Sequence, residues 1–136
     1  ESIQKIRTMV MYKMVEKLKI DEDTATKVLP IFLNYMKQRD ELHHEHRSII
    51  REIIDGADDE SVSVDVLKKK VTQLDENENK LGSVNRKFNE EAKKYLNERQ
   101  MVKLRVFDDI LKQDIISEMR DRRGRNRNND SSSQNR

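Results

Sequence analysis

The sequence contains no cysteine and no tryptophan, and it has only three glycines and one proline. The absence of cysteine excludes disulfides and thiolate metal ligands. So few glycines and prolines do not suit a sheet protein with many tight turns. No apolar run approaches the roughly 18 residues that would cross a bilayer. The remaining composition, 40% charged and 34% hydrophobic, is typical of long and partly exposed helices.

Apolar residues recur every three or four positions in four stretches, each preceded by polar residues that favour a helix start. The predicted helices cover residues 2–19, 21–54, 64–96 and 97–120. Pro30 lies inside the second helix, where its missing amide predicts a bend or loosened first turns. Gly56 is expected at the left-handed position that ends this helix. We therefore predict an all-α fold: an extended four-helix protein with a long bent helical hairpin and shorter terminal helices.

The third helix is expected to bury one apolar stripe. Its members are Leu67, Val71, Leu74, Leu81, Phe88, Ala92 and Tyr95. Glu78 and Asn85 fall on the same stripe and interrupt it. A structural coiled-coil adaptor, one alternative for a chain of this kind, needs a continuous stripe, so the two polar residues count against it.

The charge distribution separates residues 1–120, which we expect to form a single helical domain, from residues 121–136. The latter hold five arginines, two aspartates and no apolar residue, which gives a net charge of +3. The total of +2 leaves −1 for residues 1–120. We predict a disordered arginine-rich tail. Because no aromatic residue lies between the arginines for base stacking, we expect no nucleic-acid partner.

Two predicted helix starts resemble each other. Residues 20–28 align without gaps to residues 96–104, with an apolar residue, a small polar acceptor, a glutamate, and then lysine and an apolar residue in both. The second copy, Leu96-Asn97-Glu98-Arg99-Gln100, resembles the LTxxQ motif of the Spy and CpxP-type periplasmic proteins. The helix start of that family is of the Leu-Thr-Pro-Glu-Gln type; the second copy keeps its leucine and glutamine, and the first copy, Ile20 to Thr24, lacks both the proline and the glutamine.

The resemblance covers roughly residues 5–120 and implies several properties. It implies a helical hairpin fold paired into a homodimer, and export to the periplasm by a signal peptide that this sequence does not contain. Members of the family include chaperones of the envelope stress response that need no ATP. Other members are described as zinc-associated proteins or heavy-metal sensors. We therefore expect a chaperone-like protein that binds partly unfolded clients, with a metal-binding sensor or resistance-associated protein as the alternative.

The second helix carries the residues that we expect to bind clients. Its apolar stripe is broken in the middle by charged residues, as in a helix that is not packed along its whole length. A basic and patchily apolar surface there would attract an unfolded client by charge and hold it by apolar contact. The candidates are Arg39, Leu42, Arg47, Ile50, Arg51 and Ile54. An ordinary solvated helix face explains the same residues.

All three histidines lie within the stretch ELHHEHRSII, residues 41–50. His43 and His46 share a helix face, and Asp40 lies one turn before His43 and His44. These residues supply two or three ligands, fewer than the four of a closed zinc site, so Glu78 or a second chain would have to complete it. The metal alternative uses Asp40, His43, His44 and His46 with zinc or another divalent transition metal; otherwise we expect no cofactor. No motif of an enzyme is present, and we expect no catalytic activity.

Overall fold

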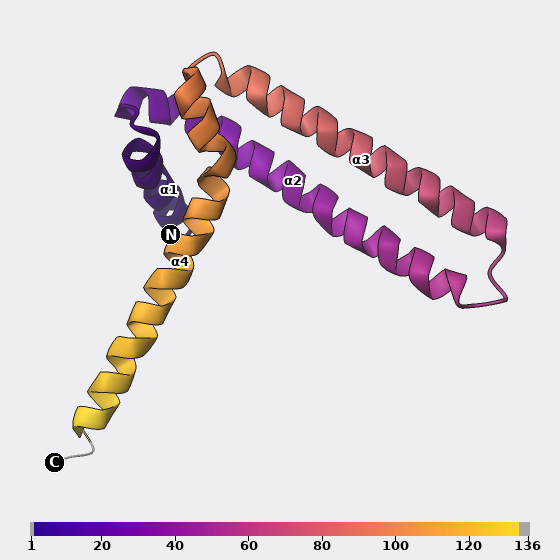
Figure 1. Cartoon of the computed structure of the whole chain (residues 1–136). Helices are drawn as coiled ribbons and strands as arrows, with labels where there is room; N and C mark the ends of the chain where they lie inside the picture. Colours follow the sequence, from indigo (N-terminus) through magenta and orange to yellow (C-terminus); the bar gives the residue numbers. More distant parts are fainter. Residues whose placement is uncertain (1, 134–136) are drawn as a thin grey trace. The chain divides into compact units, whose positions relative to one another are not determined.

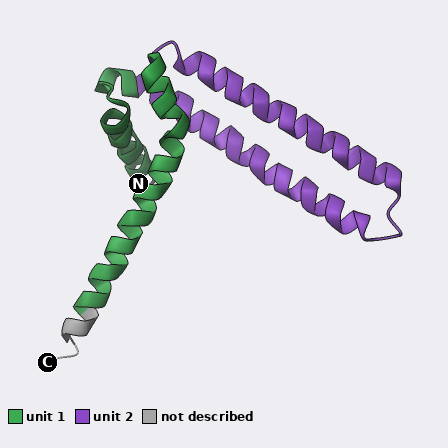
Figure 2. Ribbon diagram, viewed as in Figure 1, with its two compact units in different colours: residues 1–25, 97–136 green, residues 26–96 purple. Residues whose placement is uncertain are grey.

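The computed structural model describes the backbone of residues 2–133 and the side chains of residues 3–129. The described chain forms four helices and no strand, which confirms the predicted all-α fold (Figure 1). The helices are α1 (Ser2–Leu18), α2 (Glu22–Ala57), α3 (Val64–Ala92) and α4 (Glu98–Ser133). The chain divides into two compact units, one of residues 1–25 and 97–136 and the other of residues 26–96 (Figure 2). Whether residues 1–120 fold as one cooperative domain stays a prediction.

The predicted helix starts are confirmed by their capping bonds. At the start of α2, Asp21 Oδ1 accepts a hydrogen bond from the Thr24 amide at 2.7 Å. Ser63 accepts from the Val66 amide at the start of α3. At the start of α4, Asn97 Oδ1 accepts from the Gln100 amide at 2.8 Å, and Gln100 Oε1 accepts from the Asn97 amide at 3.0 Å. This reciprocal pair is a capping box, which satisfies amides that the first helical turn leaves unpaired.

Gln100 also connects the two similar helix starts. Its Nε2 donates to the carbonyl oxygen of Lys19, 3.4 Å away, at the end of α1. Lys19 has a φ of 57° and is the residue that turns the chain between α1 and α2. Gln100 therefore makes three hydrogen bonds, two with Asn97 and one with Lys19.

The core of the first unit comes from α1, α4 and the start of α2. Its buried apolar side chains are Val10, Met14, Leu18, Ile20, Ala25, Leu104, Phe107 and Leu111. An ion pair of 3.1 Å between Lys13 and Asp114 joins α1 to α4. Ile3 and Ile6, which the apolar spacing placed on the same stripe, are 71% and 54% exposed.

The second unit is the predicted hairpin, in which α2 and α3 run antiparallel (Figure 1). Phe32, Tyr35 and Phe88 pack at one end, with the rings of Tyr35 and Phe88 stacked 4.1 Å apart. At the other end the turn contains Asp59, whose carboxylate accepts from the amide and hydroxyl of Ser61. These two bonds lower the pKa of Asp59 below its usual value.

The prediction for Gly56 is wrong. Gly56 lies within the last turn of α2, and no glycine in the described chain has a positive φ. A Cβ at this position would approach Leu67 Cδ2 to 2.9 Å, so the glycine lets α3 come close to α2. Pro30, the ninth residue of α2, lies within the helix without ending it, although its ring removes one main-chain donor.

The apolar stripe of α3 agrees with the prediction at five of its seven positions. Leu67, Leu74, Leu81, Phe88 and Ala92 are buried or half-buried as expected. Val71 and Tyr95 are more than 40% exposed, and Glu78 is exposed as well. The interface with α2 instead contains Lys70 and Asn77, and Asn77 is only 2% exposed.

Two predicted helix ends differ from the structure. Residues 93–96 form a tight turn instead of a last helical turn, with the Tyr95 amide bonded to the Ala92 carbonyl at 3.0 Å. The last helix continues past Arg120 to Ser133, and every described side chain from 115 to 129 is exposed. The predicted disorder of residues 121–136 in solution stays a prediction, and residues 134–136 lie outside the described residues.

Candidate functional site

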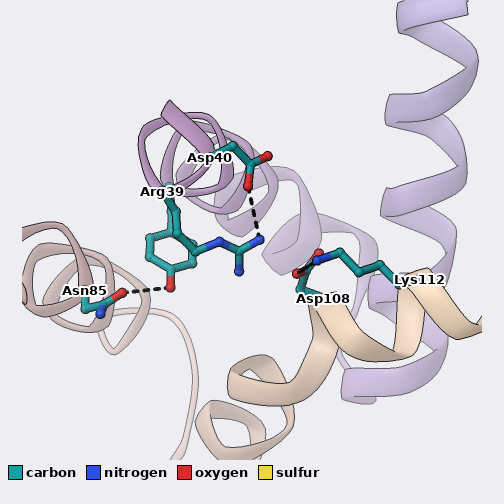
Figure 3. A network of polar contacts seen from close by, with 6 residues as sticks. Arg39, Asp40, Asn85, Asp108 and Lys112 are labelled. Atoms are coloured by element: carbon teal, nitrogen blue, oxygen red, sulfur yellow. Dashed lines mark hydrogen bonds and ion pairs between the residues drawn. The ribbon is translucent and has the colours of Figure 1, made fainter. Parts of the chain in front are cut away.

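Polar groups are built into the interface between α2 and α3. The Tyr35 hydroxyl donates to Asn85 Oδ1 at 2.8 Å (Figure 3), and Asn77 Nδ2 donates to the Leu42 carbonyl oxygen at 3.0 Å. Lys70 and Glu52 form an ion pair of 2.8 Å. Each bond joins the two helices, so the polar residues fix how the hairpin pairs.

The candidate metal ligands are not gathered into one site. Asp40, His43 and His44 are exposed on α2, while His46 is half-buried and its Nε2 lies 3.7 Å from Glu78 Oε1 on α3. The structure thus brings His46 to Glu78, the residue suggested to complete the site. Within residues 2–133, no group of three or more histidine, aspartate and glutamate side chains could hold a metal ion.

Two of the candidate client-binding residues, Arg39 and Leu42, are only partly exposed. Leu42 is half-buried, and the Arg39 guanidinium lies 5.6 Å from the centre of the Tyr35 ring. Arg39 also pairs with Asp40 at 3.4 Å (Figure 3), and only 17% of its side chain is exposed. The contacts of Arg39 leave little of its side chain at the surface, whereas Leu42 lines an open groove between α2 and α3.

The other four candidates lie together on another side of α2. Arg47 and Arg51 are four residues apart, as are Ile50 and Ile54, so the four share one side of the helix. Arg47, Arg51 and Ile54 are exposed, Ile54 by 57%, and Ile50 is half-buried. We call this surface, Arg47, Ile50, Arg51 and Ile54, the basic face of α2.

The acidic residues of the same stretch occupy the opposite flank of α2. Glu41, Glu45 and Glu52 recur at helical spacing there, and two open grooves between α2 and α3 run along this flank. One groove has a volume of about 530 Å³ and the other of about 540 Å³, and both are lined by Glu45 and Lys80. Between residues 41 and 54, the exposed arginines of α2 therefore lie on one side of the helix and the glutamates on the other.

Sequence reasoning missed an apolar groove in the other unit. It lies between α1 and α4 and is lined by Lys5, Ile6, Met9, Ile115, Glu118, Met119 and Arg122. The apolar spacing of both helices predicted which side of each is hydrophobic. The spacing could not predict at which residues the contact between α1 and α4 ends.

Comparison of the chain with protein-family models, with curated proteins and with solved structures found no match. No described helix is both long and apolar enough to span a membrane. The surfaces above therefore have to be interpreted from their own chemistry.

Proposed function

We propose that the protein shields partly unfolded proteins without ATP, as a chaperone-like binding protein of the periplasm, and that the basic face of α2 contacts the client. The observation that carries this proposal is the segregation of side chains on α2, with Arg47, Arg51, Ile50 and Ile54 on one accessible side. On this side of α2 the exposed Ile54 and the half-buried Ile50 lie beside two exposed arginines, which offers a client both apolar and charged contacts.

The chemistry of this face suits reversible binding. An exposed ion pair contributes about 0.2 to 1 kcal/mol, and each buried methylene about 0.8 kcal/mol. A client that contacts two arginines and two isoleucines gains a few kcal/mol, far less than the roughly 8 kcal/mol of a micromolar complex. Several such contacts along the helix give weak binding, and the client leaves as its own apolar groups become buried in its core.

The experiment that tests this function measures aggregation of chemically unfolded, unrelated clients diluted into buffer with the full chain. We expect the wild type to suppress light scattering and the Arg47→Glu/Arg51→Glu variant to lose most of this effect. Lys68→Glu/Lys69→Glu is the matched control, because it reverses two exposed charges on α3 of the same unit. Equal loss in both variants, or none in either, contradicts the proposed face.

A metal-binding function is favoured by one specific observation, the distance of 3.7 Å between His46 and Glu78. Two ligands are half of a closed zinc site, so this function needs ligands from a second chain. Thermal melting of metal-stripped protein with Zn²⁺, Ni²⁺ or Cu²⁺ tests it. A rise in the midpoint that His43→Ala/His46→Ala removes supports the sensor function, and sedimentation of the same samples tests the proposed homodimer.

A further inference from the structure

The groove between α1 and α4 is an uncovered continuation of a packed interface. Phe107 and Met14 are fully buried in the first unit, and Leu111 is 8% exposed. One turn further along α4, Ile115 is 39% exposed, and Met119 on the next turn is 57% exposed. On α1 the exposed fraction rises in the same way, from 5% at Val10 to 54% at Ile6.

The groove has an apolar floor and a mainly basic rim. Ile6 and Met9 of α1 and Ile115 and Met119 of α4 form the floor of a hollow of about 470 Å³. The rim carries Lys5, Arg122 and Glu118. Lys5 and Arg122 are exposed and form no ion pair with a described residue.

Basic charge continues beyond the rim along α4. Arg125 follows Arg122 by three residues and therefore lies on the same side of the helix. Its side chain is exposed, like all those described from residue 115 onward. The rim of the groove is therefore basic at Lys5 and Arg122 and acidic at Glu118, and beyond it Arg125 is accompanied by Asp121, one turn earlier on the same side of α4.

We propose that this groove binds the apolar face of an acidic amphipathic helix from another protein. Two antiparallel helices with an open apolar groove receive a third helix in the helix-in-groove mode, in which residues at i, i+3, i+4 and i+7 fill the floor. Glutamate or aspartate on the flanks of that helix meets Lys5, Arg122 and Arg125. Glu118 accepts a single basic residue and so sets the direction of the bound helix.

Two other occupants fit the groove less well. A second copy of the chain, related by a two-fold axis, would bring a rim of the same net positive charge against this one, which is less favourable than an acidic partner. An anionic membrane has the complementary charge, but a bilayer surface is flat, whereas the floor here is recessed between two helices. This inference does not rest on the proposed chaperone function, because the groove belongs to the first compact unit and the basic face of α2 to the second.

The test uses two labelled synthetic peptides that share a leucine face at i, i+3, i+4 and i+7, one with glutamate and one with lysine at all other positions. Fluorescence anisotropy with the full chain is expected to show binding of the glutamate peptide at least tenfold tighter than of the lysine peptide. Ile6→Asp/Met119→Asp is expected to weaken it at least tenfold. Val102→Asp, which changes a 70% exposed apolar residue of α4 outside the groove, leaves it unchanged.

A charge reversal makes the test independent of any loss of fold. In Lys5→Glu/Arg122→Glu the preference is expected to move toward the lysine peptide, a gain that a misfolded variant does not show. Equal binding of both peptides, or equal loss in the Val102→Asp variant, overturns the proposal. Two other results overturn the proposal if neither peptide binds. One is binding of the chain to vesicles of phosphatidylglycerol and phosphatidylcholine that Ile6→Asp/Met119→Asp abolishes. The other is self-association in sedimentation that the same variant abolishes.

Discussion

Replacing Asn77 by leucine is expected to stabilise the hairpin. The amide of Asn77 is buried at 2% exposure, and its Nδ2 donates to the Leu42 carbonyl at 3.0 Å. Its Oδ1 is buried with no hydrogen-bond partner in the described chain. The Leu42 carbonyl lies inside α2, where it accepts a main-chain bond as well, so removing the amide does not leave it unpaired.

The size of the effect follows from four opposing contributions. An unpaired buried acceptor destabilises the wild type by about 1 to 3 kcal/mol, and leucine removes this penalty. Leucine also adds apolar burial that stabilises by about 1.5 to 3 kcal/mol. Against this, the substitution loses one hydrogen bond of about 1 kcal/mol. Because leucine is larger than asparagine, overpacking destabilises the variant by about 1 to 3 kcal/mol. The central values leave a net gain of about 1 kcal/mol in the free energy of unfolding.

Urea denaturation followed by circular dichroism measures this change. The matched control is Asn85→Leu on the same helix, because Asn85 accepts from the Tyr35 hydroxyl at 2.8 Å. That substitution leaves the hydroxyl unpaired and is expected to destabilise the protein by about 1 to 2 kcal/mol. If Asn77→Leu destabilises by as much as Asn85→Leu, the reasoning about the unpaired acceptor is refuted.

Three further predictions concern the first unit. Lys19 has a φ of 57°, so Lys19→Gly is expected to raise the free energy of unfolding by about 1 kcal/mol, and a decrease contradicts this conformation. Asn97→Ala removes the cap of α4 and should cost about 1 kcal/mol in the same measurement, whereas Asn97→Asp keeps the acceptor and should cost much less; equal costs refute the capping bond. The hydrogen bond from Lys13 to Asp114 raises the pKa of Lys13 above its usual 10.5. The stabilisation of the folded state by the charged Lys13 is therefore fully present below pH 10.5, and it is lost as the pH rises through the raised pKa. Wild type should lose more stability than Asp114→Asn over that alkaline range, and parallel pH curves contradict the pairing.

The helix starts were predictable because their signals are local. Asp21 and Asn97 each precede a helix and bond an amide three residues ahead. Such bonds need only the sequence of one turn. Residues 93–96 were less predictable, because nothing in the apolar spacing distinguishes a tight turn from a last helical turn.

The exposure of Val71 and the burial of Asn77 could not be predicted from apolar spacing. Lys70 and Asn77 lie in the interface because Glu52 and the Leu42 carbonyl, both on α2, receive them. Those partners are distant in sequence. Apolar spacing therefore placed Val71 on the buried side of α3 and could not indicate that Lys70 and Asn77 lie there. Arg39 is a different case, because it packs against Tyr35, four residues earlier on the same helix, a contact that the i,i+4 spacing could have indicated.

The positions of the candidate binding residues were predictable in part. The spacing of Arg47, Ile50, Arg51 and Ile54 indicated a common side of α2, and the structure leaves most of that side exposed. The exposed fractions of Ile6 and Met119 depend on where neighbouring helices end. No periodic pattern contains that information.

The measurement that tests the central claim most directly is the binding of a permanently unfolded, fluorescently labelled client to the full chain. We expect weak, saturable binding that falls as salt is raised, because exposed charges attract the client. Arg47→Glu/Arg51→Glu should weaken it severalfold, and Lys68→Glu/Lys69→Glu should not. Absence of binding, or binding that the first variant leaves unchanged at every salt concentration, contradicts client capture by the basic face of α2.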